Sequence, residues 1–259
     1  MPHVTDSGAK KAARYGRLAW RSSFRSDPGA VRKVNEDAWL DLPEAGLWAV
    51  ADGMGGHEAG DISSQMVVDA LNLPNGHEPT LALVEDISAR LRDVNARLRA
   101  LAAERYRGRQ IGSTIAVLMA VGRRAICLWA GDSRIYRYRK GELAQLTRDH
   151  SHVADLIAKG LLDATKASLH QHANVITRAV GAAERLVLDR QDGDVEDGDV
   201  YVLCSDGLTR VLDDREIAAA LGDPDCGKAA KALLAAALAR RPRDNVTVGV
   251  VRATPHLAA

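Results

Sequence analysis

LWAVADG, at residues 47–53, is an apolar run that ends in an aspartate and a glycine, and VYVLCSDG, at residues 200–207, repeats the pattern. Each run has the length and the continuous apolar character of a buried strand. Each therefore predicts a strand that delivers a carboxylate, Asp52 or Asp206, at its C-terminal end. The glycine that follows lets the backbone turn or approach another group closely.

Other acidic residues are placed so that they can join these two carboxylates. They are Glu36 and Asp37 upstream, Asp132 between the two runs, and Asp244, which with Asn245 precedes a last apolar run. Buried carboxylates that lie close together repel one another unless they share protons or bind cations. Oxygen ligands without nearby cysteine or histidine pairs suit Mg²⁺ or Mn²⁺ better than zinc. From the residues alone, a shared metal site and a set of unrelated turn residues are equally good interpretations.

Composition restricts the function only broadly. The chain has 259 residues, 46% of them hydrophobic, and a formal net charge of +1. These values are ordinary for a globular protein and do not indicate binding to nucleic acid or to an anionic membrane. No apolar stretch is long enough to span a bilayer, and residues 1–16 lack the apolar segment of a secretion signal, so we expect a cytoplasmic protein. Cys127, Cys204 and Cys226 lack CxxC spacing and are expected to be free thiols.

Apolar periodicity predicts a single domain at residues 18–254 after a flexible tail at residues 1–17. Strands are expected at residues 18–24, 38–42, 47–51, 113–121, 125–130, 134–139, 175–180, 186–191, 200–204 and 246–252. Helices are expected at residues 59–71, 83–101, 151–159, 214–221 and 227–240. The helices come in pairs instead of alternating with strands, which favours an α+β layered sandwich over a doubly wound parallel sheet.

Other acidic residues and the histidines have simpler explanations. The remaining aspartates near turn signals are interpreted as solvated turn residues: Asp27, Asp41, Asp192, Asp194, Asp197 and Asp199. Four histidines suggest a zinc site, but they do not offer paired ligands at a fixed helical spacing. We therefore interpret them as flap and surface residues: His150, His152, His170 and His172.

Eight motifs in order extend the pattern over nearly the whole chain, from Trp20 to Val251. Together they resemble the bacterial branch of the metal-dependent protein phosphatase 2C family. Each motif is weak alone, whereas eight in the same order are highly specific. They are VRKVNEDA (31–38), ADGMGGH (51–57), GST (112–114), AGDSR (130–134), LTRDHS (146–151), VITRAVG (175–181), CSDGL (204–208) and RDNVT (243–247).

The resemblance implies a fold, an activity and a metal centre. The fold would be a central β-sandwich of two antiparallel sheets flanked by helix pairs. The activity would be hydrolysis of phosphoserine and phosphothreonine in proteins, with two Mn²⁺ or Mg²⁺ ions and a third ion at a weaker position. Residue by residue, the family's ligands of the first ion correspond to Asp52, Asp206 and Asp244; those of the second to Asp37, Asp52 and the Gly53 carbonyl, with Glu36 holding metal-bound water; those of the third to Asp132 and Asp206.

Polar residues next to these ligands would bind the substrate. A phosphate needs a planar cation, and Arg32, four residues before Glu36, suits bidentate binding. The resemblance also implies that Arg32 is a phosphate clamp and that Asn245 hydrogen-bonds the phosphate or an ordered water. Ser113 and Thr114 are expected to pack beneath the site. Catalysis is therefore assigned to Arg32, Asp37, Asp52, Asp206, Asp244 and Asn245.

The chain departs from the family pattern at Met54. Animal members have a histidine there, taken as the general acid for the leaving alkoxide, and a methionine cannot donate a proton. His57 is close in sequence and is a candidate for the general acid, but a structural role explains this histidine equally well. The proton donor stays open at this point, and a water on the third ion, near Asp132, is another candidate.

The leading hypothesis is a monomeric protein serine/threonine phosphatase that uses metal-activated water. Kinship implies that phosphorylated proteins are its partners, namely a bacterial eukaryotic-like serine/threonine kinase and the targets of that kinase. Two alternatives are a catalytically silent regulator that binds phosphoproteins on the same fold, and a metal-dependent phosphatase of small molecules or diesters. The flap, about residues 151–178, corresponds to the family's substrate-gating segment and is expected to tune substrate choice.

Overall fold

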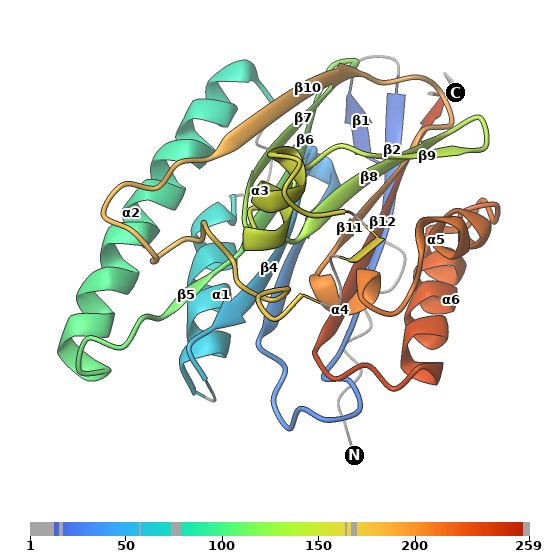
Figure 1. The fold of residues 1–259 in the computed structure, drawn as a ribbon. Helices are drawn as coiled ribbons and strands as arrows, with labels where there is room; N and C mark the ends of the chain where they lie inside the picture. Colours follow the sequence, from blue (N-terminus) through green and yellow to red (C-terminus); the bar gives the residue numbers. More distant parts are fainter. Residues whose placement is uncertain are drawn as a thin grey trace.

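The computed structural model describes residues 13–15, 18–56, 58–73, 79–163, 165–166 and 170–255. Within these residues, two antiparallel sheets face each other between two layers of helices (Figure 1). The strands are β1 Ala13–Tyr15, β2 Leu18–Asp27, β3 Asp37–Leu42, β4 Leu47–Met54, β5 Gly112–Ser113, β6 Ile115–Val121, β7 Arg124–Ala130, β8 Arg134–Arg139, β9 Glu142–Gln145, β10 Asp189–Asp194, β11 Val200–Cys204 and β12 Val246–Pro255. The helices are α1 Glu58–Leu71, α2 Leu81–Arg105, α3 His152–Ala158, α4 Asp206–Thr209, α5 Asp214–Ala220, α6 Cys226–Ala239 and the short 3₁₀ helix Pro43–Ala45.

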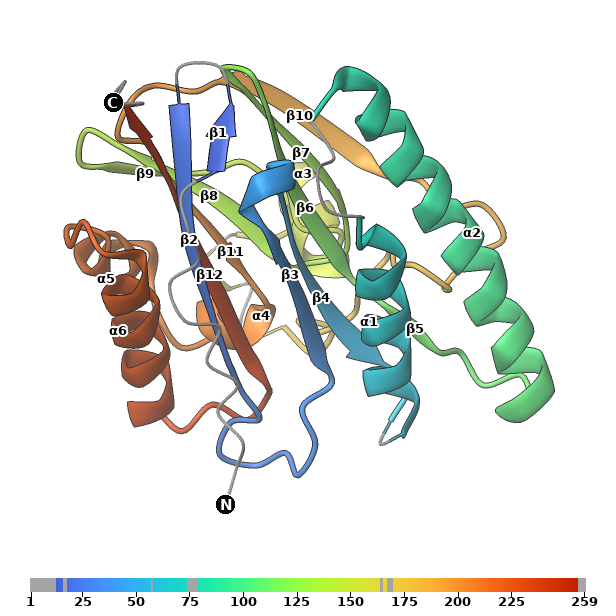
Figure 2. The ribbon, with the colours of Figure 1, turned by 180° about the vertical axis from the view of Figure 1, so that it is seen from behind.

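The first sheet has the strand order β1-β2-β12-β11-β8-β9, and the second has the order β10-β7-β6-β4-β3, with β5 added beside β4. Helices α1 and α2 cover the outer face of the second sheet, and α5 and α6 cover the outer face of the first, as Figures 1 and 2 show from opposite sides. This α-β-β-α layering confirms the fold class expected from the sequence.

The four layers explain why β4 and β11 are apolar without alternation. In β4, Ala49 packs toward α1 and α2, while the neighbouring Trp48 packs between the two sheets. In β11, Val202 packs toward α5 and α6, while Leu203 packs between the sheets. Because both faces of each strand are covered, neither face selects for polar residues.

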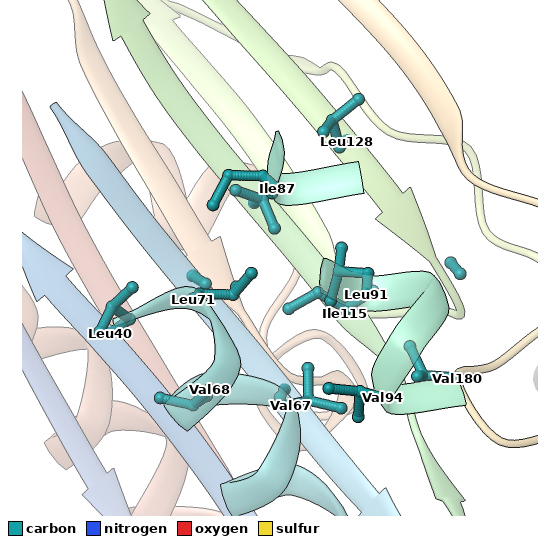
Figure 3. Close-up of a cluster of buried hydrophobic side chains, with 14 of the residues drawn as sticks. Leu40, Val67, Val68, Leu71, Ile87, Leu91, Val94, Ile115, Leu128 and Val180 are labelled. Atoms are coloured by element: carbon teal, nitrogen blue, oxygen red, sulfur yellow. The ribbon is translucent and has the colours of Figure 1, made fainter. Parts of the chain in front are cut away.

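The packing of α1 and α2 on the second sheet is drawn in Figure 3. Val67 and Leu71 of α1 and Leu91 of α2 meet Ile115 of β6 in a cluster of fully buried side chains. The clustered residues of each helix recur at intervals of three and four, which places them on one face. This cluster fixes the helix pair against the sheet that carries Asp37 and Asp52.

Four elements differ from the sequence expectation. Residues 175–180 form no strand and contribute only isolated bridges, Ser151 to Ile176 and Ser113 to Val180. The strand expected at residues 186–191 lies instead at β10, whose acidic and glycine-rich sequence is held by pairing with β7. The short elements β9 and α4 were not expected. The run at residues 113–139 also divides between sheets, because β8 crosses to the first sheet.

Two aspartates interpreted as solvated turn residues are in fact buried. Asp41 lies in β3 and accepts a hydrogen bond from Ser22 Oγ at 2.6 Å. Asp199 pairs with Arg139 through both carboxylate oxygens, at 2.7 and 2.6 Å. The turn signals around them were misleading because each carboxylate has a hydrogen-bond donor in another element of the fold.

Smaller expectations can also be compared with the described residues. Ala13–Tyr15, within the tail expected at residues 1–17, pairs with β2, and the rest of that range lies outside the described residues. The three cysteines are free and buried, as expected. None of the described helices combines the length and the apolar character that crossing a membrane requires.

Candidate metal centre

The expected aspartates lie near the ends of strands from both sheets, close enough to act on one another electrostatically. From the second sheet, Asp37 at the start of β3 pairs with Asp52 near the end of β4. From the first sheet, Asp206 begins α4 directly after β11, and Asp244 lies just before β12. Asp132 lies in the crossing from β7 to β8. The site therefore depends on both sheets.

Asp37 is held by residues of the opposite sheet. Its Oδ2 accepts hydrogen bonds from Ser205 Oγ at 2.8 Å and from Thr247 Oγ1 at 2.7 Å. Ser205 Oγ in turn accepts a hydrogen bond from the Thr247 amide at 2.9 Å. These bonds fix the orientation of the carboxylate across the junction between the sheets.

Asn245 binds the backbone of the loop between β2 and β3. Its Oδ1 accepts from the Glu36 amide at 2.8 Å, and its Nδ2 donates to the carbonyls of Pro28 and Val34, both at 3.0 Å. Both amide hydrogens are therefore used by the backbone. The side chain therefore clamps the loop that carries Arg32, and the expected hydrogen bond from Asn245 to a phosphate or an ordered water stays a prediction.

The two Asp-Gly glycines are required by close backbone approaches. A Cβ on Gly53 would lie 1.9 Å from the carbonyl oxygen of Gly60 in α1. A Cβ on Gly207 would lie 1.9 Å from the carbonyl oxygen of Asn245. Neither position tolerates a side chain, so in both cases the glycine lets a neighbouring segment pack against the aspartate's backbone.

Ser113 and Thr114 lie beneath Asp52, as expected. Thr114 Oγ1 accepts from the Asp52 amide at 2.9 Å, and Ser113 Oγ donates to the Asp52 carbonyl at 3.1 Å. Thr114 Oγ1 also shares a hydrogen bond of 2.7 Å with Ser133 Oγ, next to Asp132. These contacts hold the backbone of Asp52, a predicted ligand, and do not involve its carboxylate.

The carboxylates raise one another's pKa in addition to the effect of burial. Burial raises the pKa of Asp37 to about 7 against the lowering effect of its two hydroxyl donors, and burial with Asp206 raises that of Asp132 to about 7. Burial, with Asp37 next in importance, raises the pKa of Asp52 well above its usual range. Burial also raises the pKa of Asp206, to about 6, although Arg210 acts in the opposite direction. The site thus concentrates negative charge that only protons or cations relieve.

Two arginines supply part of that positive charge. Arg32 Nη2 lies 3.0 Å from Asp244 Oδ1, and its Nη1 lies 3.9 Å from Glu36 Oε2. Arg210 forms an ion pair with Asp206 and approaches Asp244 Oδ2 to 3.9 Å. Arg210 was not among the residues expected at the site, although its place four residues after Asp206 is a signal for an ion pair on one helical turn.

A cavity of about 540 Å³ opens beside these residues. One wall consists of the predicted ligands Asp132, Asp206 and Asp244. The other walls come from the flap, α4 and the segment before β12, and they include Arg210 and Arg243. The acidic site therefore borders a space with basic side chains that can receive an anionic group.

A second polar network anchors the flap next to Asp132. His150 Nδ1 accepts from the Gly131 amide at 3.2 Å, so its Nε2 carries the hydrogen that meets Asp189 Oδ2 at 3.1 Å. Burial lowers the pKa of His150, which favours this neutral form. Arg178 completes the network by donating to Asp189 Oδ1 at 2.6 Å. His150 is therefore a buried structural residue and not the surface residue expected.

The residues present fit a divalent metal by their chemistry. Among the described residues, nothing donates a hydrogen bond to Oδ1 of Asp37, Asp132 or Asp206, although all three oxygens are buried. Unpartnered buried carboxylate oxygens are what Mg²⁺ or Mn²⁺ would bind. No group of three or more acidic, histidine or cysteine side chains among the described residues already has an arrangement that could hold a metal ion. The fit therefore rests on donor type and unpartnered oxygens.

At the position where the animal members of the family have their general acid, this chain has Met54. Met54 ends β4, where its backbone pairs with Gly112. His57 lies outside the described residues. The other flap histidines, His152, His170 and His172, have ring centroids 5.5–6.0 Å apart and contact one another.

Comparison with known proteins places these observations in a family. The family model described as Protein phosphatase 2C matches residues 30–240. A serine/threonine protein phosphatase of Mycobacterium tuberculosis, PstP, is 36% identical over 234 residues, which is 90% of this chain. The match covers only 45% of PstP, so the chain spans about half the length of that relative.

Solved structures give the same result. The structure of PppA, a key regulatory component of T6SS in Pseudomonas aeruginosa, has a TM-score of 0.84 and 44% identity and covers 94% of this chain and 100% of that one. The catalytic domain of PstP in complex with two manganese ions has a TM-score of 0.83 and 34% identity, covering 92% and 99% of the two chains.

Proposed function

This chain belongs to the protein phosphatase 2C family, and from that premise we propose that it hydrolyses phosphoserine and phosphothreonine in proteins. The observation that carries the proposal is the meeting of carboxylates from both sheets beside Arg32 and an open cavity. Mn²⁺ or Mg²⁺, when bound, would polarise the phosphoryl group and lower the pKa of a coordinated water. The residues that would hold two ions, or three, are Glu36, Asp37, Asp52, Gly53 through its carbonyl, Asp132, Asp206 and Asp244.

The chain's own residues bind and orient the substrate. Arg32 is the phosphate clamp, because its half-exposed guanidinium lies at the rim of the acidic site. Asn245 keeps Arg32 in place by clamping the loop on both sides of it. Ser205 and Thr247 keep the Asp37 carboxylate turned toward the other acids. Met54 takes no part in proton transfer.

Hydrolysis of an aryl phosphate tests the proposal most directly. We expect turnover with Mn²⁺, loss of turnover on chelation, and a decrease of about a hundredfold or more in kcat for Asp206→Asn, because that variant removes a ligand charge. Asp197→Asn, at an exposed aspartate paired with Arg123, is the matched control and should keep full activity. Unchanged activity in Asp206→Asn contradicts the assigned site.

The choice of substrate needs a second comparison. A phosphothreonine peptide should be hydrolysed faster than mononucleotides or a bis-aryl diester, whereas the reverse order would favour a small-molecule phosphatase. Binding of the peptide without turnover would favour a silent regulator. We expect the substrates to be targets of a serine/threonine kinase, and phosphoproteomics of a deletion strain should show them as hyperphosphorylated proteins.

A further inference from the structure

Arg210 occupies a particular place in the acidic site. It lies directly after the short helix α4, four residues beyond Asp206, and one Nη pairs with Asp206 Oδ2. Its other Nη is directed to Asp244 Oδ2, 3.9 Å away. The guanidinium therefore bridges two carboxylates that come from different segments and are both predicted ligands of the same ion.

The charge of Arg210 acts on more than its direct partner. Arg210 lowers the pKa of Asp206 and also that of Asp132, opposing burial and the neighbouring carboxylates. Burial, followed by the neighbouring carboxylates with Asp37 first, raises the pKa of Asp52 well above its usual range. Arg210 is thus a counter-charge for one half of the acidic site.

We propose that Arg210 is a resident cation of the metal-free site, beside Arg32, and that a divalent ion binding to Asp206 and Asp244 has to displace the Arg210 guanidinium. This inference rests on the proposed function, because it assumes that these two carboxylates bind a metal. Asp206 and Asp244 would hold that ion with the same carboxylate groups that now pair with the guanidinium. Two positive charges at one place repel strongly when the surroundings are partly buried.

Arg210 also has the freedom to leave. Its side chain is 37% exposed, compared with 10% for Asp206. It lines the 540 Å³ cavity, which gives the long side chain open space to move into. A residue that only oriented Asp206 would be better served by a buried, rigid position.

The direction in which Mn²⁺ affinity changes when Arg210 is replaced distinguishes competition with the metal from orientation of Asp206. If Arg210 competes, Arg210→Ala should bind Mn²⁺ roughly threefold to tenfold more tightly than the natural chain, a range typical for the loss of one partly exposed charge interaction. Arg210→Lys, which keeps the charge but loses the planar bridge, should lie between the two. Isothermal titration calorimetry of the chelator-treated full chain measures this directly.

Arg243 provides the matched control. It lines the same cavity, and among the described residues no ion pair joins it to a predicted ligand. Arg243→Ala should therefore change Mn²⁺ affinity by less than twofold. The metal-free Tm should fall in Arg210→Ala and stay unchanged in Arg243→Ala, and added Mn²⁺ should raise the Tm of Arg210→Ala by more than that of the natural chain.

Unchanged or weaker Mn²⁺ binding by Arg210→Ala would overturn the inference and leave Arg210 as an orienting or neutral residue. Such a result would not contradict the proposed function. The natural chain can still hydrolyse an aryl phosphate with Mn²⁺, in which case only the competition by Arg210 is wrong.

Discussion

The two strand endings at Asp52-Gly53 and Asp206-Gly207 have the same residues and different structures. After Asp52 the strand β4 continues to Met54, because Gly53 pairs with Ser113 of β5. After Ser205 the chain turns at once into α4. The Asp-Gly pair therefore permits a close backbone approach in both places, but it does not determine the conformation that follows.

The two strand endings also differ in the charges that surround their aspartates. Asp206 is followed on the same turn by Arg210, and its pKa is raised only to about 6. Asp52 has no such residue on its strand, and carboxylates of both sheets surround it. A helix places residue i+4 beside residue i, whereas a strand carries it far away. The comparison shows how secondary structure decides whether an acidic residue carries its own counter-charge.

The largest effect should come from the feature that the endings share. Gly53→Ala and Gly207→Ala should each lower the free energy of unfolding by roughly 3 kcal/mol or more, because each Cβ meets a carbonyl oxygen that cannot move without shifting the backbone. Activity should fall together with stability. Denaturant unfolding measures the change, and Gly193→Ala in β10, where a Cβ meets nothing within 4 Å, is the control. Equal stability of Gly53→Ala and Gly193→Ala would contradict the close approach.

The next effect concerns pH and separates the endings. An aspartate whose pKa is raised in the folded state binds more protons there than in the unfolded chain, so stability falls as pH rises between the two values. From the values near 6 and 7, the metal-free Tm should fall by roughly 5 °C between pH 4 and 7 on account of these groups. Asp52→Asn should reduce this fall more than Asp206→Asn, which calorimetry at several pH values can measure.

Bound Mn²⁺ should reverse the direction of this pH dependence, since the ion favours the ionised carboxylates. A metal-free Tm that rises steadily from pH 4 to 7 would show that other groups outweigh the acidic site. If Asp52→Asn and Asp206→Asn changed the pH dependence of the Tm equally, the inferred difference in charge between the two strand endings would be wrong.

The smallest effect concerns the residue before each aspartate. Ser205 bonds to Asp37 across the sheets, whereas the corresponding Ala51 makes only apolar contacts. Ser205→Ala should cost about 1 kcal/mol of stability and lower kcat about threefold to tenfold, because Asp37 loses one of its two hydroxyl donors. Ser88→Ala removes a buried hydroxyl that donates within α2, and it should lower stability without changing kcat. The same kcat in both variants would contradict the link between the sheets.

Much of the fold could be predicted because its patterns are local. The apolar runs predicted β4 and β11, and helical spacing predicted α1, α2 and α6 within a few residues. The strand expected at residues 175–180 was wrong, since an apolar pattern cannot show whether a partner strand is available. The helix α4 was missed because four residues are too few to display a helical period.

The acidic residues of the site could be predicted, whereas their supports could not. Carboxylates after apolar runs are visible in the sequence. The role of Asn245 depends on a loop that folds against it, and its partner Glu36 in that loop is 209 residues away in the chain. The bond between Ser205 and Asp37 likewise exists only where the two sheets meet. Such contacts arise from tertiary structure, which no local pattern encodes.

The pairing of β2 with β12 has a consequence for how the protein is made. These strands pair along their whole length, from Leu18 with Pro255 to Asp27 with Val246. Ser26 and Thr247, which share a hydrogen bond, are 221 residues apart in the chain. During synthesis at roughly 5–20 residues per second, β2 therefore waits about ten seconds or longer for its partner. The acidic site can assemble only after Asp244 has been synthesised and has left the ribosome, and contacts of such long range make folding slow.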